Sequence, residues 1–185
     1  PGMDKQARTL REAAAIFGDS GLKDTASDPL LPLLAEIESF YIKKVMGTDD
    51  PIKLDGFLKE GLGFFSDTAR LDTLREIIVS KLNSSLDTPQ APVLLLWEGK
   101  VLTLQSSYNL AAESLKRVIE EYTADEYLSS AAAPSALYEL AVMRWKHSEA
   151  AEEARALLNS LVETWPSSAN IPAASAALVE LEALD

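Results

Sequence analysis

The chain has 185 residues, of which 47% are hydrophobic, and this suffices for one domain with a substantial core. Lys and Arg number 17 against 29 Asp and Glu, so the formal net charge of −12 disfavours nucleic acid as a partner. The same charge suits a basic protein partner, or it only keeps the protein in solution. No cysteine is present, which excludes disulfides, thiolate nucleophiles and cysteine-ligated metals.

Membrane insertion is not expected for this chain. The longest apolar run, Pro92 to Trp97, is far shorter than the roughly 20 residues that cross a bilayer. The first residues also lack the basic and apolar regions of a signal peptide. We therefore expect this segment to be soluble and assign it a cytoplasmic location, and leave open a native targeting segment or anchor outside the given sequence.

Apolar residues recur at helical spacing along almost the whole chain, which predicts an all-α fold. In the N-terminal half, Asp28-Pro29 and Asp50-Pro51 each combine an N-cap residue with proline at the first helical position. Gly61 and Gly63 either admit a neighbouring helix closely or leave their own helix irregular. The helices predicted here cover residues 4–17, 28–46 and 52–65, and a stretch between Asp67 and Leu86.

Residues 87–92 form a proline-marked break, where we expect a seam between a loosely repeated half and a better-defined one. Short connections in the second half make consecutive helices antiparallel. The last helix is rich in alanine and is either a C-terminal cap or an internal helix. The helices predicted here cover residues 92–105, 107–122, 134–146, 148–165 and 169–184, with a short extra turn at 125–130.

Two segments of the second half repeat the same order of small and large apolar residues. Aligning Tyr122 with Trp165 gives an offset of 43 residues. This order indicates helical hairpins that stack on one another. The aligned pairs are Ala111 with Ala154, Leu115 with Leu158, Val118 with Leu161, and Glu120 with Glu163.

These residues resemble the tetratricopeptide repeat (TPR), a helix-turn-helix unit. One copy has Tyr138, Ala141, Val142 and Trp145 in its first helix, with Ala154, Leu158, Leu161 and Pro166 in its second; the other has Leu95, Gly99 and Leu102, then Ala111, Leu115 and Val118. The departures are Val142 at a small position, Leu161 where alanine is preferred, Thr123 where proline is expected, and a longer period. The residues between Tyr122 and Pro134 therefore resemble an insertion.

The resemblance implies a TPR-like α-solenoid, a right-handed superhelix of about 9–10 helices forming a single α-helical repeat domain over residues 1–185. Residues 28–86 would be degenerate helical hairpins, and residues 92–185 TPR-like repeats with a C-terminal capping helix. Such arrays bind a protein or peptide along a concave groove. The carboxylate clamp of some members is not expected, because Leu96 and Lys100 stand where lysine and then asparagine would be needed.

Helical phase predicts which residues would line that groove. Lys100 and Lys146 either hold an acidic group of the partner or lie on a solvated face. The predicted inward positions are Val93, Leu96, Lys100 and Thr103 on the first copy and Ala136, Glu139, Met143 and Lys146 on the second.

Residues for catalysis, metal binding or a cofactor are not apparent. His147 is the only histidine, which excludes a multi-histidine metal site in one chain, and we expect it in a solvated turn. The pairs Glu120-Glu121 and Glu152-Glu153 are adjacent in sequence and suit exposed faces. The segment Gly61-Leu62-Gly63 lacks the other parts of a phosphate-binding loop.

The aromatic residues admit two interpretations. Adjacent aromatics such as Phe40-Tyr41 and Phe64-Phe65 cannot both face one core, so we expect one of each pair to point either to a partner or to another helix layer. The remaining set fits core packing better than a ligand cage. Its members are Trp97, Trp145, Trp165, Tyr108, Tyr122 and Tyr138.

The leading functional hypothesis is a noncatalytic scaffold or adaptor that binds a partner protein on the repeat surface. One alternative is a structural subunit buried in an obligate multi-subunit complex. Another is an all-helical enzyme or small-ligand carrier, which requires a closed apolar pocket with convergent polar groups.

Overall fold

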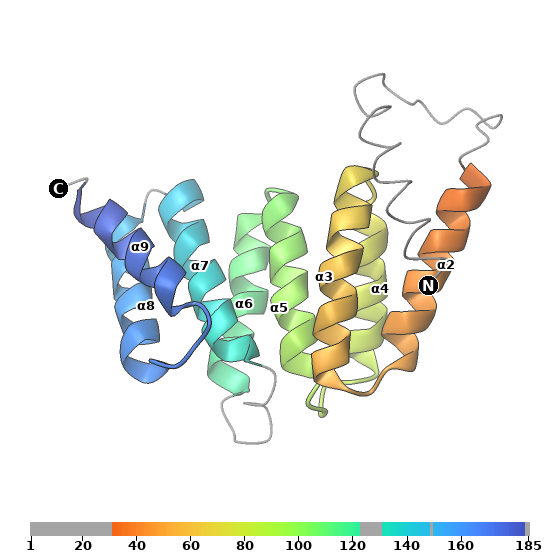
Figure 1. Ribbon diagram of the computed structural model, residues 1–185, viewed down its shortest axis with the longest axis horizontal. Coiled ribbons are helices and arrows are strands. Elements are labelled where there is room, and N and C mark those ends of the chain that lie inside the picture. Colours follow the sequence, from red (N-terminus) through yellow and green to blue (C-terminus); the bar gives the residue numbers. More distant parts are fainter. Residues whose placement is uncertain (1–30, 123–130, 149, 184–185) are drawn as a thin grey trace. The chain divides into compact units, whose positions relative to one another are not determined.

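The computed structural model describes residues 31–122, 131–148 and 150–183. Within these residues the chain forms eight α-helices and no strand, and consecutive helices pack together, which confirms the all-α prediction (Figure 1). The predicted helix at 4–17 and the extra turn at 125–130 lie outside the described residues.

The helices lie close to their predicted positions, with ends that differ by a few residues. The chain divides into two compact units, residues 1–81 and 82–185, and each is described by itself. The division falls in the last turn of the fourth predicted helix, before the expected seam at 87–92, and the single repeat domain stays a prediction. The helices are α2 (Leu31–Gly47), α3 (Pro51–Asp67), α4 (Leu71–Asn83), α5 (Ala91–Leu104), α6 (Tyr108–Glu121), α7 (Ala132–Ser148), α8 (Ala151–Thr164) and α9 (Ile171–Glu182).

Helix α3 begins as its sequence predicts. The Asp50 carboxylate accepts hydrogen bonds from the backbone N–H groups of Ile52 at 2.9 Å and Lys53 at 3.2 Å, and Pro51 occupies the first turn. The bond from the Lys53 amide is the main cause that lowers the pKa of Asp50. The carboxylate therefore satisfies helix donors that would otherwise lack a partner.

Aromatic packing in unit 1 corrects the expectation for Phe64-Phe65. Both phenyl rings are fully buried, with their centroids 5.1 Å apart in an edge-to-face pair. The ring of Tyr41 on α2 lies 5.7 Å from that of Phe64 and 5.8 Å from that of Phe65. The premise that these two rings cannot face one core is wrong, because Tyr41 on α2 contacts both, and neither ring is exposed for a partner.

The pair Phe40-Tyr41 divides as expected, since Tyr41 is buried and Phe40 is half-buried. The ammonium group of Lys44 lies 4.3 Å from the centroid of the Phe40 ring, so the exposed part of that ring already has a cation beside it. Whether Phe40 contacts a partner stays a prediction.

Gly61 does not mark an obligatory close approach. A Cβ there would lie 3.6 Å from Cδ1 of Tyr41 and 3.7 Å from Cδ1 of Leu74, which is ordinary van der Waals contact. The helix α3 also runs through this position without interruption. Neither interpretation of this glycine from the sequence is therefore required by the structure.

A buried lysine in unit 1 was not apparent from the sequence. The Lys81 ammonium donates to the backbone carbonyl of Met46 at 3.2 Å and lies 3.4 Å from the Asp49 carboxylate. Met46 belongs to the last turn of α2, where carbonyl groups have no partner within the helix. Lys81, which belongs to α4, thus donates a hydrogen bond to a carbonyl group at the C-terminal end of α2.

In unit 2, helices α5 to α9 lie side by side in chain order (Figure 1). Each helix packs on the next, and α5 also packs on α7. Almost the whole first half of α5 is buried, from Ala91 to Trp97. The core of unit 2 therefore lies between successive helices. It also includes the contact between α5 and α7, which are separated by α6 in the sequence.

The repeated apolar positions of α6 and α8 are the ones that the structure buries. Three residues on each helix have almost no exposed surface, at the same spacing, and they face the preceding helix of the pair. They are Ala111, Leu115 and Val118 on α6, and Ala154, Leu158 and Leu161 on α8.

Helices α5 and α6 approach each other closely at Gly99. A Cβ on Gly99 would lie 2.6 Å from Cγ and 2.7 Å from Cδ2 of Leu115, closer than real Cβ atoms approach. In the second pair, Ala141 is fully buried and Val142 is half-buried. Ala141 is thus the more buried of the two, and the assignment of the small position to Val142 stays a prediction.

Gly99→Ala is expected to lower the free energy of unfolding of unit 2 by about 1–3 kcal/mol, because the added methyl group overpacks the crossing. The matched control is Gly56→Ala in α3, where nothing lies within 4 Å of the added Cβ. That change should stabilise by up to about 1 kcal/mol through helix propensity. The denaturant midpoints of the two variants, monitored by circular dichroism, test this prediction. Equal stability of the two variants contradicts the packing described for Gly99.

Tyr122 connects the end of α6 to the segment before α5. Its hydroxyl donates to the backbone carbonyl of Leu86 at 3.0 Å, and its side chain is buried. This burial is the main cause that raises the pKa of the Tyr122 phenol above its ordinary value. The neutral phenol is therefore the form that the folded state favours.

Tyr122→Phe is expected to cost about 1 kcal/mol at pH 8 through the lost hydrogen bond. Because the folded-state pKa is raised, the contribution of the phenol is complete below the ordinary pKa of about 10 and is lost as the pH rises through the folded-state pKa. The difference in unfolding free energy between the two proteins should therefore shrink between pH 8 and pH 11 in urea titrations. A difference that stays constant over this range contradicts the assignment.

Candidate partner-binding surface

The predicted groove residues lie on the facing sides of α5 and α7, which pack against each other. Four of them are buried, whereas Lys146 is exposed and the other three are half-buried. The predicted positions thus differ in exposure, and their place in a binding groove stays a prediction. The buried residues are Val93, Leu96, Ala136 and Met143; the half-buried ones are Lys100, Thr103 and Glu139.

Lys100 connects the two helices. Its ammonium group lies 3.0 Å from the carboxylate of Glu139 on α7 and 4.6 Å from the centroid of the Trp97 ring on α5. Because both groups are half-buried, the ion pair contributes at most about 1 kcal/mol. Lys100 is thus a partnered cation within the molecule.

Thr103 and Met143 meet one helical turn further along the same contact. The Thr103 hydroxyl donates to the backbone carbonyl of Gly99 at 2.9 Å, and its oxygen lies 3.8 Å from the sulfur of Met143. The accessible part of the predicted site is therefore a polar surface above a packed apolar seam. We name it the α5–α7 surface, made of Lys100, Thr103, Glu139 and Lys146; its role in binding a partner stays a prediction.

His147 is exposed, as expected, but it lies in the last turn of α7 rather than in a turn between helices. Its ring stacks on that of Tyr108 at the start of α6, with centroids 4.6 Å apart and planes inclined by 12°. The sequence did not predict this contact, because the two residues belong to different helical pairs.

The aromatic residues of unit 2 pack largely as core. Trp97 and Tyr122 are buried, and Tyr138, Trp145 and Trp165 pack against the apolar cluster that α7, α8 and α9 share. Burial raises the pKa of the Tyr138 phenol, and the nearby carboxylates of Glu139 and Glu180 raise it further. These positions support the packing interpretation over a ligand cage.

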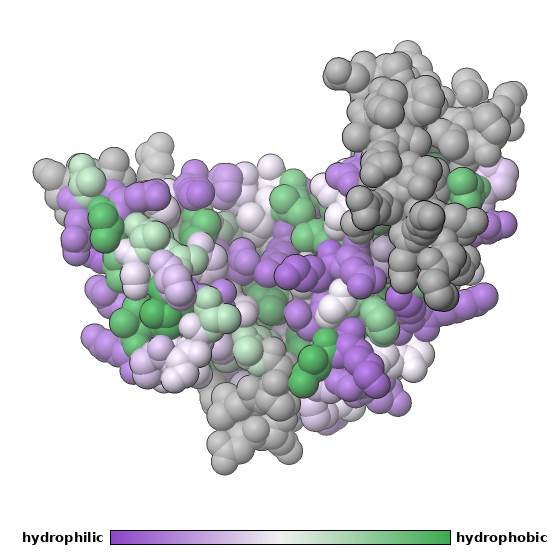
Figure 2. All heavy atoms as spheres, in the orientation of Figure 1, coloured by the Kyte–Doolittle hydropathy of each residue, from purple (hydrophilic) through white to green (hydrophobic). Residues whose placement is uncertain are grey.

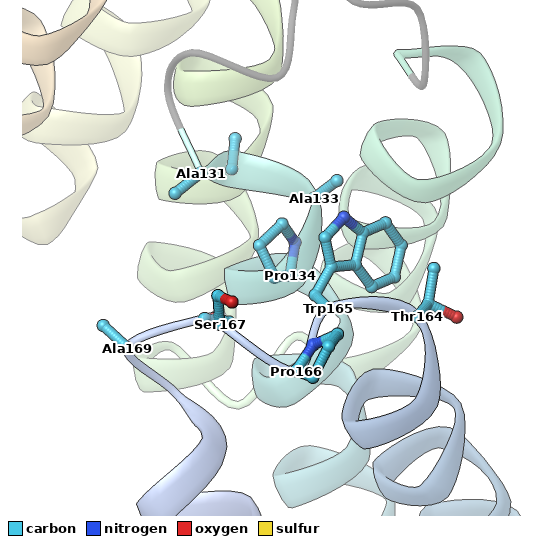
Figure 3. A pocket seen from close by; sticks show the side chains of 10 residues that line it. Ala131, Ala133, Pro134, Thr164, Trp165, Pro166, Ser167 and Ala169 are labelled. Carbon is cyan, nitrogen blue, oxygen red and sulfur yellow. The ribbon is translucent and has the colours of Figure 1, made fainter.

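A cleft of about 430 Å³ was not predicted from the sequence. It lies between the start of α7 and the segment that connects α8 to α9, and Trp165 and Pro134 form part of its wall (Figure 3). The amide of Asn170 donates to the Ser135 hydroxyl at 3.1 Å and connects the same two segments. The lining has no charged residue and consists of Ala131, Ala132, Ala133, Pro134, Thr164, Trp165, Pro166, Ser167, Ser168 and Ala169.

This cleft has the size of a small binding site but not the chemistry of a catalytic one. Its lining offers hydroxyl groups and apolar surface, and no side chain that titrates near neutral pH or ligates a metal. Within the described part of the chain, no group of three or more His, Asp or Glu residues is placed to hold a metal ion. None of the described helices is both long and apolar enough to cross a membrane.

The comparisons with known proteins leave the family open. No protein-family model, no curated protein and no solved structure matches this chain. The function therefore has to be argued from the packing and the surfaces described above.

Proposed function

We propose that this chain is a noncatalytic protein-interaction scaffold whose helices α5 to α9 form a TPR-like stack. The observation that carries the proposal is the burial of the same small and large positions on α6 and α8. A helical pair of this kind cannot bury its apolar face alone, so successive pairs stack and present an extended surface. That surface is what such an array offers to a partner.

The contact between α5 and α7 supports the same proposal. In a stack of hairpins, the first helices of successive pairs lie against each other, and α5 and α7 have this relation. Their shared side carries Lys100, Thr103, Glu139 and Lys146. This α5–α7 surface is the proposed binding site, and a protein segment is the proposed ligand.

The overall charge favours a basic partner. With a net charge of −12, the chain attracts Lys- and Arg-rich segments over distances of about the Debye length. Steering of this kind raises association rates at low ionic strength and weakens as salt is added.

The test is affinity capture from native extract with the wild-type chain, followed by mass spectrometry. Thr103→Arg is expected to reduce capture of the partner at least tenfold, because a long side chain then covers the α5–α7 surface. The matched control is Asn109→Arg, which makes the same charge change at an exposed position of α6. Circular dichroism verifies that both variants stay folded.

Capture should also fall as salt is raised from about 0.05 M to 0.5 M, because the shorter Debye length screens the charge. A partner that the Thr103→Arg and Asn109→Arg variants retain equally argues against the α5–α7 surface. A chain that captures no protein at either salt concentration argues against the scaffold function itself.

A further inference from the structure

The last described helix, α9, has two apolar sides. One side is buried, with Ala174, Ala177 and Leu181 in the cluster that it shares with α7 and α8. The opposite side carries Pro172, Ala176 and Val179, which are exposed at helical spacing; Val179 is 65% exposed. A terminal capping helix is expected to have a polar outer side, so this side of α9 does not suit a cap.

Helix α7 shows what covers the equivalent side one pair earlier. Both helices have proline in the first turn, and aligning Pro134 with Pro172 matches their buried positions. The fully buried Ala136 and Met143 of α7 then correspond to the buried Ala174 and Leu181 of α9. The same alignment also matches residues on the opposite sides of the two helices.

On that opposite side, the Leu137 and Ala141 positions of α7 correspond to Ser175 and Val179 of α9. Leu137 and Ala141 are buried in the cluster that contains Ala154 and Leu158 of α8. The side of α9 that is exposed is therefore the side that, on α7, is covered by the second helix of the pair. In Figure 2, apolar colours appear on the part of the surface where Figure 1 places α8 and α9.

The charges beside the exposed apolar side of α9 indicate which kind of helix can pack there. Glu180 lies on one border of the exposed apolar stripe and Glu182 on the other, and both are exposed. Helix α9 has no basic residue, and neither glutamate forms an ion pair within the described residues. A second copy of α9 would place carboxylates against carboxylates, which disfavours self-association. Lys or Arg at the borders of an incoming helix would complement both.

We propose that the exposed side of α9 binds an amphipathic helix of a partner protein, packed antiparallel to α9 as α8 packs on α7. The incoming helix carries a small and two large apolar residues at the spacing of Ala154, Leu158 and Leu161, with Lys or Arg on its borders. This proposal rests on the proposed function, since it adds a second surface to the scaffold.

The probe is a labelled peptide of residues 151–164 in which Glu153 is replaced by lysine, so that this position and Arg155 place a positive charge on each border of the apolar stripe. A covalent link between positions 156 and 160, both exposed on α8, keeps the peptide helical. The control peptide has the same link and the native glutamates. Binding to the full chain is measured by fluorescence anisotropy, and light scattering gives the mass of the chain alone.

The lysine peptide is expected to bind at least tenfold more tightly than the glutamate peptide. Val179→Gln should weaken its binding about tenfold, because a buried valine contributes roughly 1.5 kcal/mol or more. The matched variant Leu110→Gln, at an exposed position of α6, should leave binding unchanged. Both substitutions are at exposed positions and should leave the circular dichroism spectrum unchanged.

Three results overturn the proposal. They are the absence of saturable binding up to about 1 mM peptide, equal binding by the Val179→Gln and Leu110→Gln variants, and a dimer of the chain that Val179→Gln dissociates. None of these results affects partner capture that depends on Thr103, so a failure at α9 leaves the proposed function standing.

Discussion

The contact between Gly99 and Leu115 is the constraint on which the packing of unit 2 depends. The two helices approach so closely that no side chain larger than hydrogen fits at position 99. Close approach lets the leucine of α6 reach the backbone of α5, and in the next pair Ala141 and Leu158 are buried in one cluster. Small residues at the crossings therefore set how near successive helices lie, and hence which side chains reach the surface above them.

Much of this fold could be predicted from the sequence, since helix positions depend mostly on local signals. Asp50-Pro51 marks a helix start because the Asp50 carboxylate accepts hydrogen bonds from two backbone N–H groups, and because proline has no N–H group that needs an acceptor. The repeated Ala-Leu-Leu spacing of α8 identified its buried side for a similar reason, as burial of one stripe follows from helical periodicity. Neither signal needs knowledge of the neighbouring helix.

The remaining features of the fold depend on contacts between helices, which the sequence of one helix does not specify. Phe64 and Phe65 are both buried because Tyr41, from another helix, contacts both rings. Leu96 and Met143 are buried because α5 and α7 touch, so a groove inferred from phase alone included residues that the packing covers.

The proposed binding function rests on the accessible surfaces of the described residues. Polar side chains on the α5–α7 surface are engaged with each other, as in the ion pair of Lys100 and Glu139, and the cleft beside Trp165 has an uncharged lining. What remains accessible is surface: a polar strip above the α5–α7 seam and an apolar strip on α9 bordered by Glu180 and Glu182. Surfaces of different character suit a protein that holds more than one partner.

The contact between α5 and α7 is the part of the structure that distinguishes a stack of pairs from helices that merely follow one another. Zero-length carbodiimide cross-linking of the native chain tests it most directly, because an amide bond forms only between a lysine and a carboxylate already in contact. With the two groups 3.0 Å apart, mass spectrometry should find Lys100 joined to Glu139, and Glu139→Gln should abolish that product alone. A native chain in which Lys100 is joined to other carboxylates and never to Glu139 would contradict the stacked arrangement.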